Sequence, residues 1–460
     1  MQAMDTILVL CTEGASYRNF VNAGVIDELK KKAKIVLVCA DWMEEHLRKK
    51  YPDLALEIVY EPGKAESIAD HIRMTKTIYR ASVWPDIQTS TFKIIRGRTI
   101  KEQPIKFWIR RGMAIASRPA IIQAGLRKIA WLWPKKPVKE LFQKYDITKV
   151  FSTNVLCLDH VPYAEYALWK NIPLVAAVLS WDNMTSKGTP MYLPNRLLMW
   201  GPKQKKECIN LHNLPENILR ECGAAQFDCY FKNDIPTKSE VFSKLKIPKN
   251  AKVITYVGGI PANVMGMTAE NEKVIVDTIL QGMDDGSLPS EAILVIRPHP
   301  GVKDWEQYQT FEKHPKVRMN YPAWFLQGKE PPKSWNPNWE DHKFMGALMK
   351  YSSVAITPGG SATLDAACFD NPAVNVYFDT PPRPYLFSLK SHCDFAHLIY
   401  LREFRATPFV ESTDELLEEV KDGFEKPAKY KEGRKKMLDS IIGAQDGKSA
   451  VRTAEEVLDA

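Results

Sequence analysis

The stretch from residue 353 to residue 383 constrains the fold more than any other part of the sequence. An apolar run, a proline-glycine break, a helical pattern that an Asn-Pro pair ends, and a second apolar run follow one another there. These four pieces are 354–356, 358–360, 361–370 and 374–378. A short apolar run that ends in a tight glycine turn and passes into a helix is typical of a parallel α/β sheet. The stretch therefore predicts a strand, a turn, a helix and a second strand.

The glycine turn Pro358-Gly359-Gly360 also has a chemical consequence. A turn of this kind at the start of a helix directs several backbone N–H groups, and the positive end of the helix dipole, towards one point. A diphosphate would fit there, and Asp365, one helical turn further on, is placed to accept hydrogen bonds from a ribose hydroxyl. The alternative is that the glycines only form a tight turn and that Ser361 only caps the helix.

The chain has 460 residues, which is too long for one hydrophobic core and predicts two domains. No apolar run approaches the ~18–20 residues that a membrane span needs. Asp5 precedes the first short apolar run, so no signal peptide is expected. The eight cysteines show no CxxC pair or zinc spacing, and the nine histidines show no HExxH cluster. We therefore expect a cytoplasmic protein with reduced cysteines and no bound metal.

The first half of the sequence alternates between apolar runs and helical patterns. The predicted strands are 6–11, 33–40, 56–60, 149–152, 173–179, 196–200 and 218–222. This β-α-β order predicts a doubly wound parallel sheet. The polar segment Ser180-Trp181-Asp182-Asn183 follows the strand 173–179 directly. Open α/β sheets bind ligands at such strand ends, so this segment is a candidate for function.

The strand pattern lapses from about residue 63 to residue 137, and positive charge is concentrated there. Between residues 73 and 139, 16 lysines and arginines stand against two acids, a balance of +14, whereas the whole chain carries +8. Apolar residues form two stripes at helical spacing: Ile105, Trp108, Ile109 and Met113, and Ile122, Leu126, Ile129 and Trp133. Basic amphipathic helices with tryptophan suit an anionic membrane surface. The alternative is a helical insertion that packs on the protein with a solvated basic face. No nucleic-acid partner is expected, because no recognition module is visible.

The second half has its own β/α pattern, and three of its strand ends carry ligand-binding residue types. Gly258-Gly259 follow the strand 252–257, and Arg297-Pro298-His299 follow the strand 292–296. The third strand end is the glycine turn after 354–356. Because successive strand ends of a parallel sheet meet at one edge, we expect these residues to converge. Arginine binds phosphate in a bidentate manner and histidine donates hydrogen bonds to it, so the set predicts a nucleotide-diphosphate pocket.

The second half resembles the C-terminal domain of GT-B glycosyltransferases. It is most similar to the branch that contains CDP-glycerol glycerophosphotransferases, capsule and lipopolysaccharide glycosyltransferases, and UDP-GlcNAc 2-epimerases. The resemblance covers about residues 195–455 and rests on short motifs: Gly223 to Asp228, Gly258-Gly259, Arg297-Pro298-His299-Pro300, Pro358-Gly359-Gly360-Ser361-Ala362-Thr363, Asn371-Pro372-Ala373-Val374 and Asp446-Gly447-Lys448-Ser449-Ala450. The first half matches in architecture only.

The resemblance implies a GT-B fold, in which two Rossmann-like doubly wound domains face each other across a cleft where the reaction takes place. It divides the chain into an N-terminal acceptor domain, 1–232, with a basic helical insertion at about 63–137, and a C-terminal donor domain, 233–428. The helices in 429–460 would cross back to the N-terminal domain.

The resemblance also implies which residues bind a nucleotide-sugar donor: Gly258, Gly259, Arg297, His299, Pro358, Gly359, Gly360, Ser361, Ala362, Thr363 and Asp365. Arg297 and His299 would contact the phosphates. Ser361 and Thr363 would cradle the diphosphate, and Asp365 would take the ribose. Enzymes of this kind generally use no bound metal, because a helix dipole and basic side chains stabilise the leaving diphosphate. No DxD motif near a strand end argues otherwise.

An inverting sugar transfer needs a general base close to the acceptor hydroxyl. Four residues at predicted strand ends of the N-terminal half are candidates: Asp182, Glu13, Asp159 and His160. We rank Asp182 and Glu13 first. Each of these two could instead be a helix cap or a solvated turn residue, and a retaining transfer would need no such base.

Together these features predict a metal-independent Leloir glycosyltransferase that moves a sugar from a nucleotide-diphosphate donor to a lipid-linked or surface-glycan acceptor. An enzyme of polysaccharide, capsule or cell-envelope biosynthesis would be cytoplasmic and peripheral at the inner face of the membrane, through residues 73–139. A CDP-glycerol or ribitol-type polyol-phosphate transferase, a sugar-nucleotide 2-epimerase and a non-catalytic glycan-binding module stay open. The epimerase is disfavoured, because only Asp365 follows the glycines where the epimerases carry acidic residues.

Overall fold

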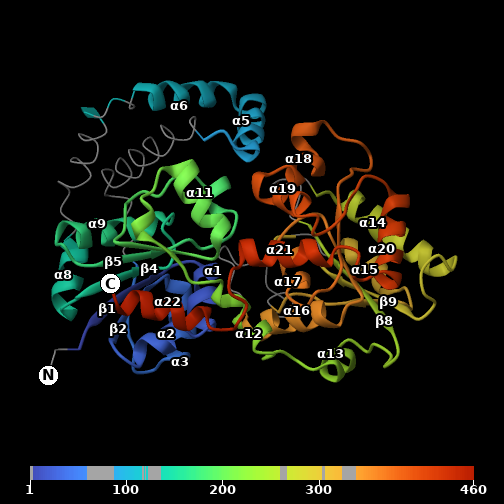
Figure 1. Ribbon diagram of the computed structural model, residues 1–460, viewed down its shortest axis with the longest axis horizontal. Coiled ribbons are helices and arrows are strands. Elements are labelled where there is room, and N and C mark those ends of the chain that lie inside the picture. Colours follow the sequence, from blue (N-terminus) through green and yellow to red (C-terminus); the bar gives the residue numbers. More distant parts are fainter. Residues whose placement is uncertain are drawn as a thin grey trace. The chain divides into compact units, whose positions relative to one another are not determined.

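In the computed structural model the chain forms two compact units (Figure 1). The structure describes residues 4–59, 87–116, 119, 121–122, 136–259, 267–302, 306–323 and 338–460. Unit 1 comprises Met1–Asp228 together with Ile441–Ala460, and unit 2 comprises Cys229–Ser440. The chain therefore enters unit 2 once and returns to unit 1 at its C-terminal segment.

Unit 1 is built on a sheet of seven parallel strands in the order β3-β2-β1-β4-β5-β6-β7. The strands are β1 (Thr6–Cys11), β2 (Lys34–Cys39), β3 (Ala55–Ile58), β4 (Lys149–Ser152), β5 (Leu174–Ala177), β6 (Arg196–Met199) and β7 (Leu219–Glu221). The chain adds β2 and β3 on one side of β1 and β4 to β7 on its other side. The strand order therefore reverses between β1 and β4, as in a doubly wound sheet.

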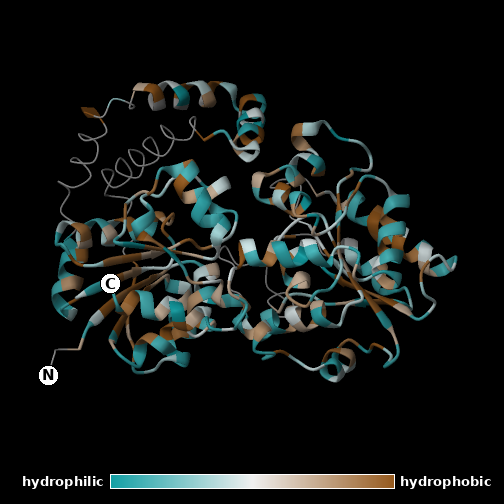
Figure 2. Ribbon diagram, in the orientation of Figure 1, coloured by the Kyte–Doolittle hydropathy of each residue, from teal (hydrophilic) through white to brown (hydrophobic). Residues whose placement is uncertain are grey.

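Both faces of this sheet are buried. Ile7 and Val9 belong to one apolar cluster, whereas Leu8 and Leu10 belong to the other, because successive side chains of a strand point to opposite faces. In Figure 2 the strands are mostly brown, whereas the helices around them carry teal segments. The helical elements of unit 1 are α1 (Gly14–Ser16), η1 (Tyr17–Asn22), α2 (Val25–Lys30), η2 (Asp41–Met43), α3 (Glu44–Lys50), α5 (Ser90–Glu102), α6 (Pro104–Ala116), α8 (Lys136–Tyr145), η4 (Leu158–His160), α9 (Val161–Trp169), α10 (Asn183–Ser186), α11 (Pro202–His212), η5 (Glu216–Ile218), η6 (Ala225–Phe227) and α22 (Ser449–Leu458).

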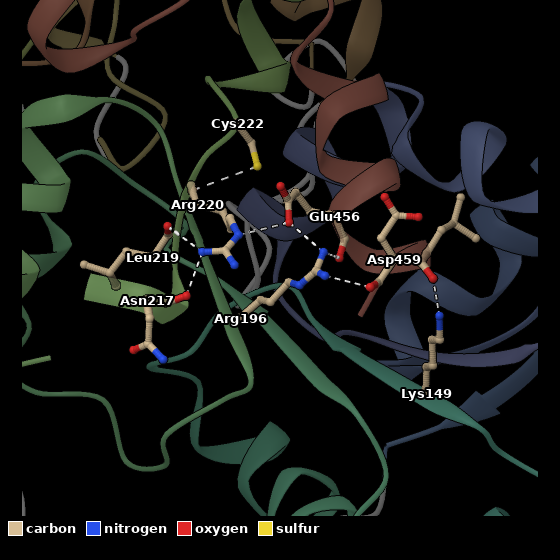
Figure 3. Close-up of polar contacts among 9 residues, drawn as sticks. Lys149, Arg196, Asn217, Leu219, Arg220, Cys222, Glu456 and Asp459 are labelled. Atoms are coloured by element: carbon tan, nitrogen blue, oxygen red, sulfur yellow. Dashed lines mark hydrogen bonds and ion pairs between the residues drawn. The ribbon is translucent and has the colours of Figure 1, made fainter. Parts of the chain in front are cut away.

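Helix α22 is attached to this sheet by ion pairs and hydrogen bonds (Figure 3). Glu456 Oε2 lies 2.7 Å from Arg196 Nη1 of β6 and 3.4 Å from Arg220 Nε of β7. Arg196 also donates to the main-chain oxygen of Asp459 at 2.6 Å. At the other end of the helix, Asp228 accepts hydrogen bonds from the first two N–H groups, at 3.1 and 2.9 Å. Residues far apart in the sequence therefore complete unit 1.

Unit 2 has a sheet of six parallel strands in the order β10-β9-β8-β11-β12-β13. The strands are β8 (Lys252–Val257), β9 (Ala292–Arg297), β10 (Val317–Met319), β11 (Val354–Thr357), β12 (Ala373–Val376) and β13 (Phe409–Val410). The helical elements are α12 (Asp228–Phe231), α13 (Lys238–Lys244), α14 (Ala269–Asp284), α15 (Glu306–Glu312), α16 (Trp339–Tyr351), α17 (Ala362–Ala367), η8 (Tyr385–Phe387), α18 (Leu389–Cys393), α19 (Ala396–Glu403), α20 (Thr413–Glu425) and α21 (Lys431–Ile441). The predicted α/β class with two doubly wound sheets is confirmed.

Helix α21 explains why the structure divides later than the boundary at 428 that the sequence predicts. The buried side chain of Arg434 donates from Nε to Asp370 Oδ1 at 2.9 Å, and Lys431 lies 3.1 Å from Asp370 Oδ2. These contacts hold α21 in unit 2. Only the chain from Ile441 onwards belongs to unit 1. The first division, after Asp228, lies slightly before the predicted boundary at 232.

The basic segment is described in part. Helices α5, α6 and the first residues of α8 lie in it, and α5 packs against α6 and α10. Most of the second predicted apolar stripe, from Leu126 to Trp133, lies outside the described residues. Among the helices that the structure describes, none has the length and apolar character that crossing a membrane requires.

Candidate functional site

The strand order of unit 2 reverses between β8 and β11, which pair with each other although β9 and β10 come between them in the chain. Open α/β sheets bind ligands beyond the carboxyl ends of strands at such a switch point. Gly258 and Gly259 follow β8, Pro358 follows β11, and His299 lies two residues past β9, the other neighbour of β8. Gly258 N donates to Arg297 O at 2.8 Å. The structure thus brings the three predicted strand ends to one edge.

The two glycines after β8 allow this close approach. A Cβ atom on Gly258 would lie 2.8 Å from Glu272 Oε1 and 3.0 Å from the backbone nitrogen of His299. A Cβ atom on Gly259 would lie 2.6 Å from Pro358 Cγ. Cβ atoms essentially never make non-bonded contacts under 3.0 Å, so a side chain at either position would force its neighbours to move. Only glycine therefore lets the end of β8 pack between the ends of β9 and β11.

The turn after β11 presents a row of backbone N–H groups. Gly359 has a φ of +91°, a conformation that glycine adopts without strain. From Gly359 to Ala362, four consecutive N–H groups have no hydrogen-bond acceptor in the described part of the chain. A Cβ atom on Gly360 would meet no described atom within 4 Å, so the turn is open on that side. Successive N–H groups that face an open space form an anion-binding concavity.

His299 adds a neutral donor to this edge. Its Nδ1 accepts a hydrogen bond from Gly301 N at 2.9 Å, and burial lowers the pKa of the imidazole to about 4. The ring is therefore neutral at pH 7, and the accepting Nδ1 leaves the proton on Nε2. That N–H is suited to a phosphate oxygen.

Arg297 is engaged differently from the phosphate contact that the sequence predicts. Its buried guanidinium pairs with Asp341 at the start of α16, with Nη2 at 2.6 Å from Oδ2 and Nη1 at 3.2 Å from Oδ1. Nη1 also donates to Asn320, which follows β10. Both terminal nitrogens are therefore occupied by protein acceptors. This geometry favours a positioning role, in which Arg297 holds α16 against the ends of β9 and β10.

The three polar residues of the glycine turn and its helix lie in different surroundings. Ser361 is exposed, and its side chain makes no capping hydrogen bond. Thr363 is buried and donates from Oγ1 to Asn375 Oδ1 of β12 at 3.2 Å, so its hydroxyl is committed to the protein interior rather than to a diphosphate. Asp365 is buried and accepts a hydrogen bond from Tyr230 Oη at 2.9 Å. The ribose role of Asp365 stays a prediction.

The sequence interpretation missed Glu272, which lies in α14 below this edge. Its Oε1 accepts hydrogen bonds from Gly259 N at 3.0 Å and from Tyr256 Oη at 3.2 Å, and its Oε2 accepts one from Tyr308. Burial raises the pKa of this carboxyl group. Glu272 therefore fixes the first glycine turn from beneath. Glu272 stands three residues before Ile275, on the apolar side of the helix, and this spacing indicates from the sequence that its carboxyl group is buried.

In unit 1 the corresponding reversal lies between β1 and β4, and Glu13 lies just past β1. Asn154, which follows β4, donates from Nδ2 to Glu13 Oε2 at 2.5 Å. Burial raises the pKa of Glu13, and the nearby Asp159 adds to the increase. A carboxyl group with a raised pKa at a switch point is suited to proton transfer near neutral pH. Glu13 is therefore the best-placed acid–base candidate in this unit.

The geometry argues against the catalytic role considered for His160. The side chain is completely buried, and burial lowers the pKa of its imidazole to about 3. Both ring nitrogens are hydrogen-bonded, Nδ1 to Ser152 Oγ at 2.9 Å and Nε2 to Thr12 Oγ1 at 3.1 Å. No acceptor hydroxyl could reach this ring. His160 instead joins the ends of β1 and β4 below Glu13.

Asp182 lies in a hydrogen-bonded turn, which was the alternative to a catalytic role for this residue. Its Oδ2 accepts a hydrogen bond from Ser186 Oγ at 2.7 Å, and its main-chain oxygen accepts one from Thr185 N at 3.1 Å. These bonds close the single turn of α10. Asp182 is therefore partly committed to local structure, which places Glu13 above it as a candidate base. Over the described ranges, no group of three or more His, Cys, Asp or Glu side chains is arranged to hold a metal ion.

No model of a known protein family matches this chain, and no curated protein matches it by sequence. Solved structures do match it over almost its whole length. A putative UDP-N-acetylglucosamine 2-epimerase from Listeria monocytogenes has a TM-score of 0.56 at 10% identity, over 98% of this chain and 95% of that one. The UDP-GlcNAc 2-epimerase of Neisseria meningitidis, bound to UDP-GlcNAc, has a TM-score of 0.54 at 14% identity, over 99% and 100%. A glycosyltransferase from Rickettsia africae ESF-5 has a TM-score of 0.51 at 11% identity, over 99% of each chain.

The chain has the GT-B fold. This confirms the fold that the short motifs imply. Identities of this size show the architecture alone, and the GT-B structures named above include both epimerases and a transferase. The reaction must therefore be argued from the residues at the two switch points.

Proposed function

We propose that the protein is a glycosyltransferase that takes a sugar from a nucleoside-diphosphate donor without a metal ion. The observation that carries the proposal is the open glycine turn at the switch point of unit 2. There the N–H groups from Gly359 to Ala362 have no acceptor among the described residues, and His299 lies two residues past β9. Among proteins with the same fold, the Neisseria meningitidis enzyme is bound to UDP-GlcNAc.

In this proposal the donor diphosphate binds at the glycine turn. Its oxygens accept hydrogen bonds from the four N–H groups and from Nε2–H of His299. Donors fixed in advance stabilise the charge that develops on the leaving diphosphate, which is the contribution a metal ion makes in other transferases. Asp365, held by Tyr230, accepts a hydrogen bond from the ribose. Because Tyr230 also stacks on His342, at 5.2 Å between ring centroids, the carboxylate has a fixed position.

The transfer itself needs one proton acceptor. A general base accepts the proton of the acceptor hydroxyl while the hydroxyl oxygen attacks the anomeric carbon, and Glu13 is the residue of unit 1 that we propose for this role. The bond from that carbon to the diphosphate oxygen breaks, and the nucleoside diphosphate leaves with the electron pair. The raised pKa of Glu13 means that it holds the accepted proton more strongly than an exposed carboxylate does.

A 2-epimerase is the second candidate, because several of the structures with this fold are UDP-GlcNAc 2-epimerases. That reaction requires acid–base groups around C2 of the sugar. Three carboxylates of unit 2 accept hydrogen bonds from protein donors: Glu272 from Gly259 and two tyrosines, Asp341 from Arg297, and Asp365 from Tyr230. Acid–base chemistry at C2 would require these carboxylates to give up protein hydrogen bonds, whereas the diphosphate contact uses N–H groups that have no acceptor in the described part of the chain, and this difference favours the transferase.

Thermal unfolding with a panel of ligands tests the proposal. UDP, CDP, GDP, their sugar conjugates and CDP-glycerol would each be added in the presence of EDTA and then with Mg²⁺. A ligand at about 100 times its Kd stabilises the native state by about 2.7 kcal/mol, which is readily measured. We expect one base to stabilise the protein equally in both conditions. No stabilisation, or stabilisation only with Mg²⁺, would contradict the proposal.

Product analysis then separates the candidate reactions. The stabilising nucleotide sugar would be incubated with the protein alone and followed by NMR. A transferase without its acceptor releases free sugar and nucleoside diphosphate slowly, whereas an epimerase returns an intact nucleotide sugar with inverted C2. Stabilisation by CDP-glycerol alone would assign the protein to the polyol-phosphate transferases instead.

A further inference from the structure

Helix α6 carries an apolar stripe that the protein leaves in solvent. Ile105 is 76% exposed, Trp108 63%, Ile109 58% and Ile115 50%. The first three are spaced i, i+3 and i+4, so they lie on one side of the helix. Hydrophobic segments are visible along α6 in Figure 2. Contiguous exposed apolar side chains of this size mark a surface that binds something.

The charge around the stripe indicates what that partner is. Residues 87–116 contain seven lysines and arginines and a single acid, Glu102. Protein interfaces are usually depleted of lysine, whereas anionic lipid headgroups attract lysine and arginine alike. Tryptophan is enriched at the boundary between headgroups and acyl chains. Apolar stripe, tryptophan and excess positive charge together fit a bilayer better than a protein partner.

The helix that precedes α6, α5, is anchored on unit 1. Thr89 caps α5 by accepting a hydrogen bond from Phe92 N, and its hydroxyl donates to Thr185 O of α10 at 3.1 Å. Phe92 and Ile94 are buried, so α5 is anchored in the protein. Helix α6 follows α5 directly, and α10 begins right after Asp182. The exposed stripe is therefore connected, through α5, to the turn at the end of β5.

We infer that α6 is a membrane-docking helix, which lies in the interface of an anionic bilayer with Ile105, Trp108, Ile109 and Ile115 inserted among the lipids. Lys101 of α5 and Arg111 of α6 contact the headgroups. Docking places the turn after β5, which Thr89 of α5 contacts at Thr185, near the lipid surface. The inference goes beyond the donor chemistry proposed above, and its test does not depend on that chemistry.

Vesicle flotation of the full chain tests the apolar contribution. Vesicles would be made of phosphatidylcholine, with or without phosphatidylglycerol as about one third of the lipid. Trp108→Ser with Ile109→Ser should weaken binding to the anionic vesicles by about a hundredfold or more, on the usual scale for burying two large apolar side chains. Trp169→Ser with Leu193→Ser is the matched control, because these residues are 53% and 50% exposed. The control should bind as the wild type does.

The same vesicles test the electrostatic contribution. Lys101→Gln with Arg111→Gln should weaken binding by about 25-fold, since each basic residue at an anionic surface changes affinity by about fivefold. The control pair, Lys435→Gln with Lys436→Gln in α21, should have no such effect. Added salt should weaken wild-type binding, because it screens exposed charges.

Several results would overturn the inference. These are no binding of the wild type to anionic vesicles, equal binding to neutral vesicles, or unchanged binding of the Trp108/Ile109 variant. A dimer that dissociates in this variant would show that a second copy covers the stripe instead. Thermal unfolding and nucleotide affinity should be unchanged in all variants, because the substituted side chains lie at the surface. Loss of flotation with intact nucleotide affinity would support docking, whereas loss of nucleotide binding alone would bear on the proposed function.

Discussion

Replacing Gly360 with larger residues tests the donor site most directly. Its Cβ position has no described atom within 4 Å, and it lies among the four N–H groups that have no acceptor in the described ranges. A side chain there would occupy the volume that the diphosphate needs. The series Gly360→Ala and Gly360→Val adds first one methyl group and then a branched side chain.

The magnitude follows from the hydrogen bonds that a bound diphosphate would lose. Each charge-assisted bond contributes ~1.5–3 kcal/mol. If valine moves the diphosphate away from two of the four N–H groups, the loss is ~3–6 kcal/mol, and Kd rises by about two to four orders of magnitude. Alanine adds less volume, so its effect should lie between glycine and valine.

Backbone strain is the competing explanation and needs its own control. Gly360 has a φ of +159°, so a side chain there also carries a conformational cost, of ~1–3 kcal/mol. Gly286 has a φ of +84° and also has no described atom within 4 Å of a Cβ, but it lies in the turn before β9, at the opposite edge of the sheet. Gly286→Val should therefore lower Tm without changing nucleotide affinity.

Calorimetric titration with the stabilising nucleotide gives Kd for each variant, and thermal unfolding gives Tm. We expect Gly360→Val and Gly286→Val to lose comparable stability, with only the former losing affinity. If Gly360→Val binds the nucleotide within a few-fold of the Gly286→Val control, the diphosphate does not bind at this turn, and the argument from the switch point fails.

Three further outcomes are expected. Glu13→Gln should lower the transfer rate by about 10²–10⁴-fold at unchanged nucleotide affinity. Because burial raises the pKa of Glu13, the acid limb of the wild-type pH–rate profile should lie above the ordinary carboxylate range. Urea unfolding should show that the free energy of unfolding falls as the pH drops from about 6.5 towards 3. The reason is that the histidine is protonated in the unfolded state, whereas folded His160, with a pKa of about 3, stays neutral. His160→Gln should make the free energy of unfolding depend less on pH over this range. Glu456→Gln should cost ~0.2–1 kcal/mol in thermal unfolding, because two arginines lose their ion-pair partner, whereas the exposed Glu455→Gln should be neutral.

Backbone features of the donor site could be predicted from the sequence. Apolar runs followed by glycines fix where β8 and β11 end, and parallel pairing then brings those ends together. The turn 358–360 needs no side-chain information, because its function resides in N–H groups and in the absence of Cβ atoms. For the same reason its geometry follows from the residue types alone.

Side-chain roles could not be predicted in the same way. Arg297 stands at a strand end, but its direction depends on Asp341, 44 residues later, and nothing local reveals that pairing. Thr363 lies on the inner side of a short helix, where Asn375 accepts its hydrogen bond. His160 is polar and follows a strand end, yet both of its ring nitrogens are hydrogen-bonded to the buried hydroxyls of Thr12 and Ser152. In each case a distant partner decides the role, and the sequence does not say which partner is within reach.

The return of α22 to unit 1 has a consequence for the order of folding. During synthesis, residues 1–228 emerge first, but Ala450, Ala454 and Val457 belong to the same buried cluster as the first strand, and Glu456 pairs with arginines of β6 and β7. The ribosome must therefore complete the whole of unit 2 before unit 1 can close its core. Unit 2 is contiguous from Cys229 to Ser440, so all its strands are synthesised before α22. Until α22 is synthesised, the apolar side chains of unit 1 that pack against it stay uncovered. Unit 1 is therefore translated before unit 2, but its core is completed after unit 2 has been synthesised.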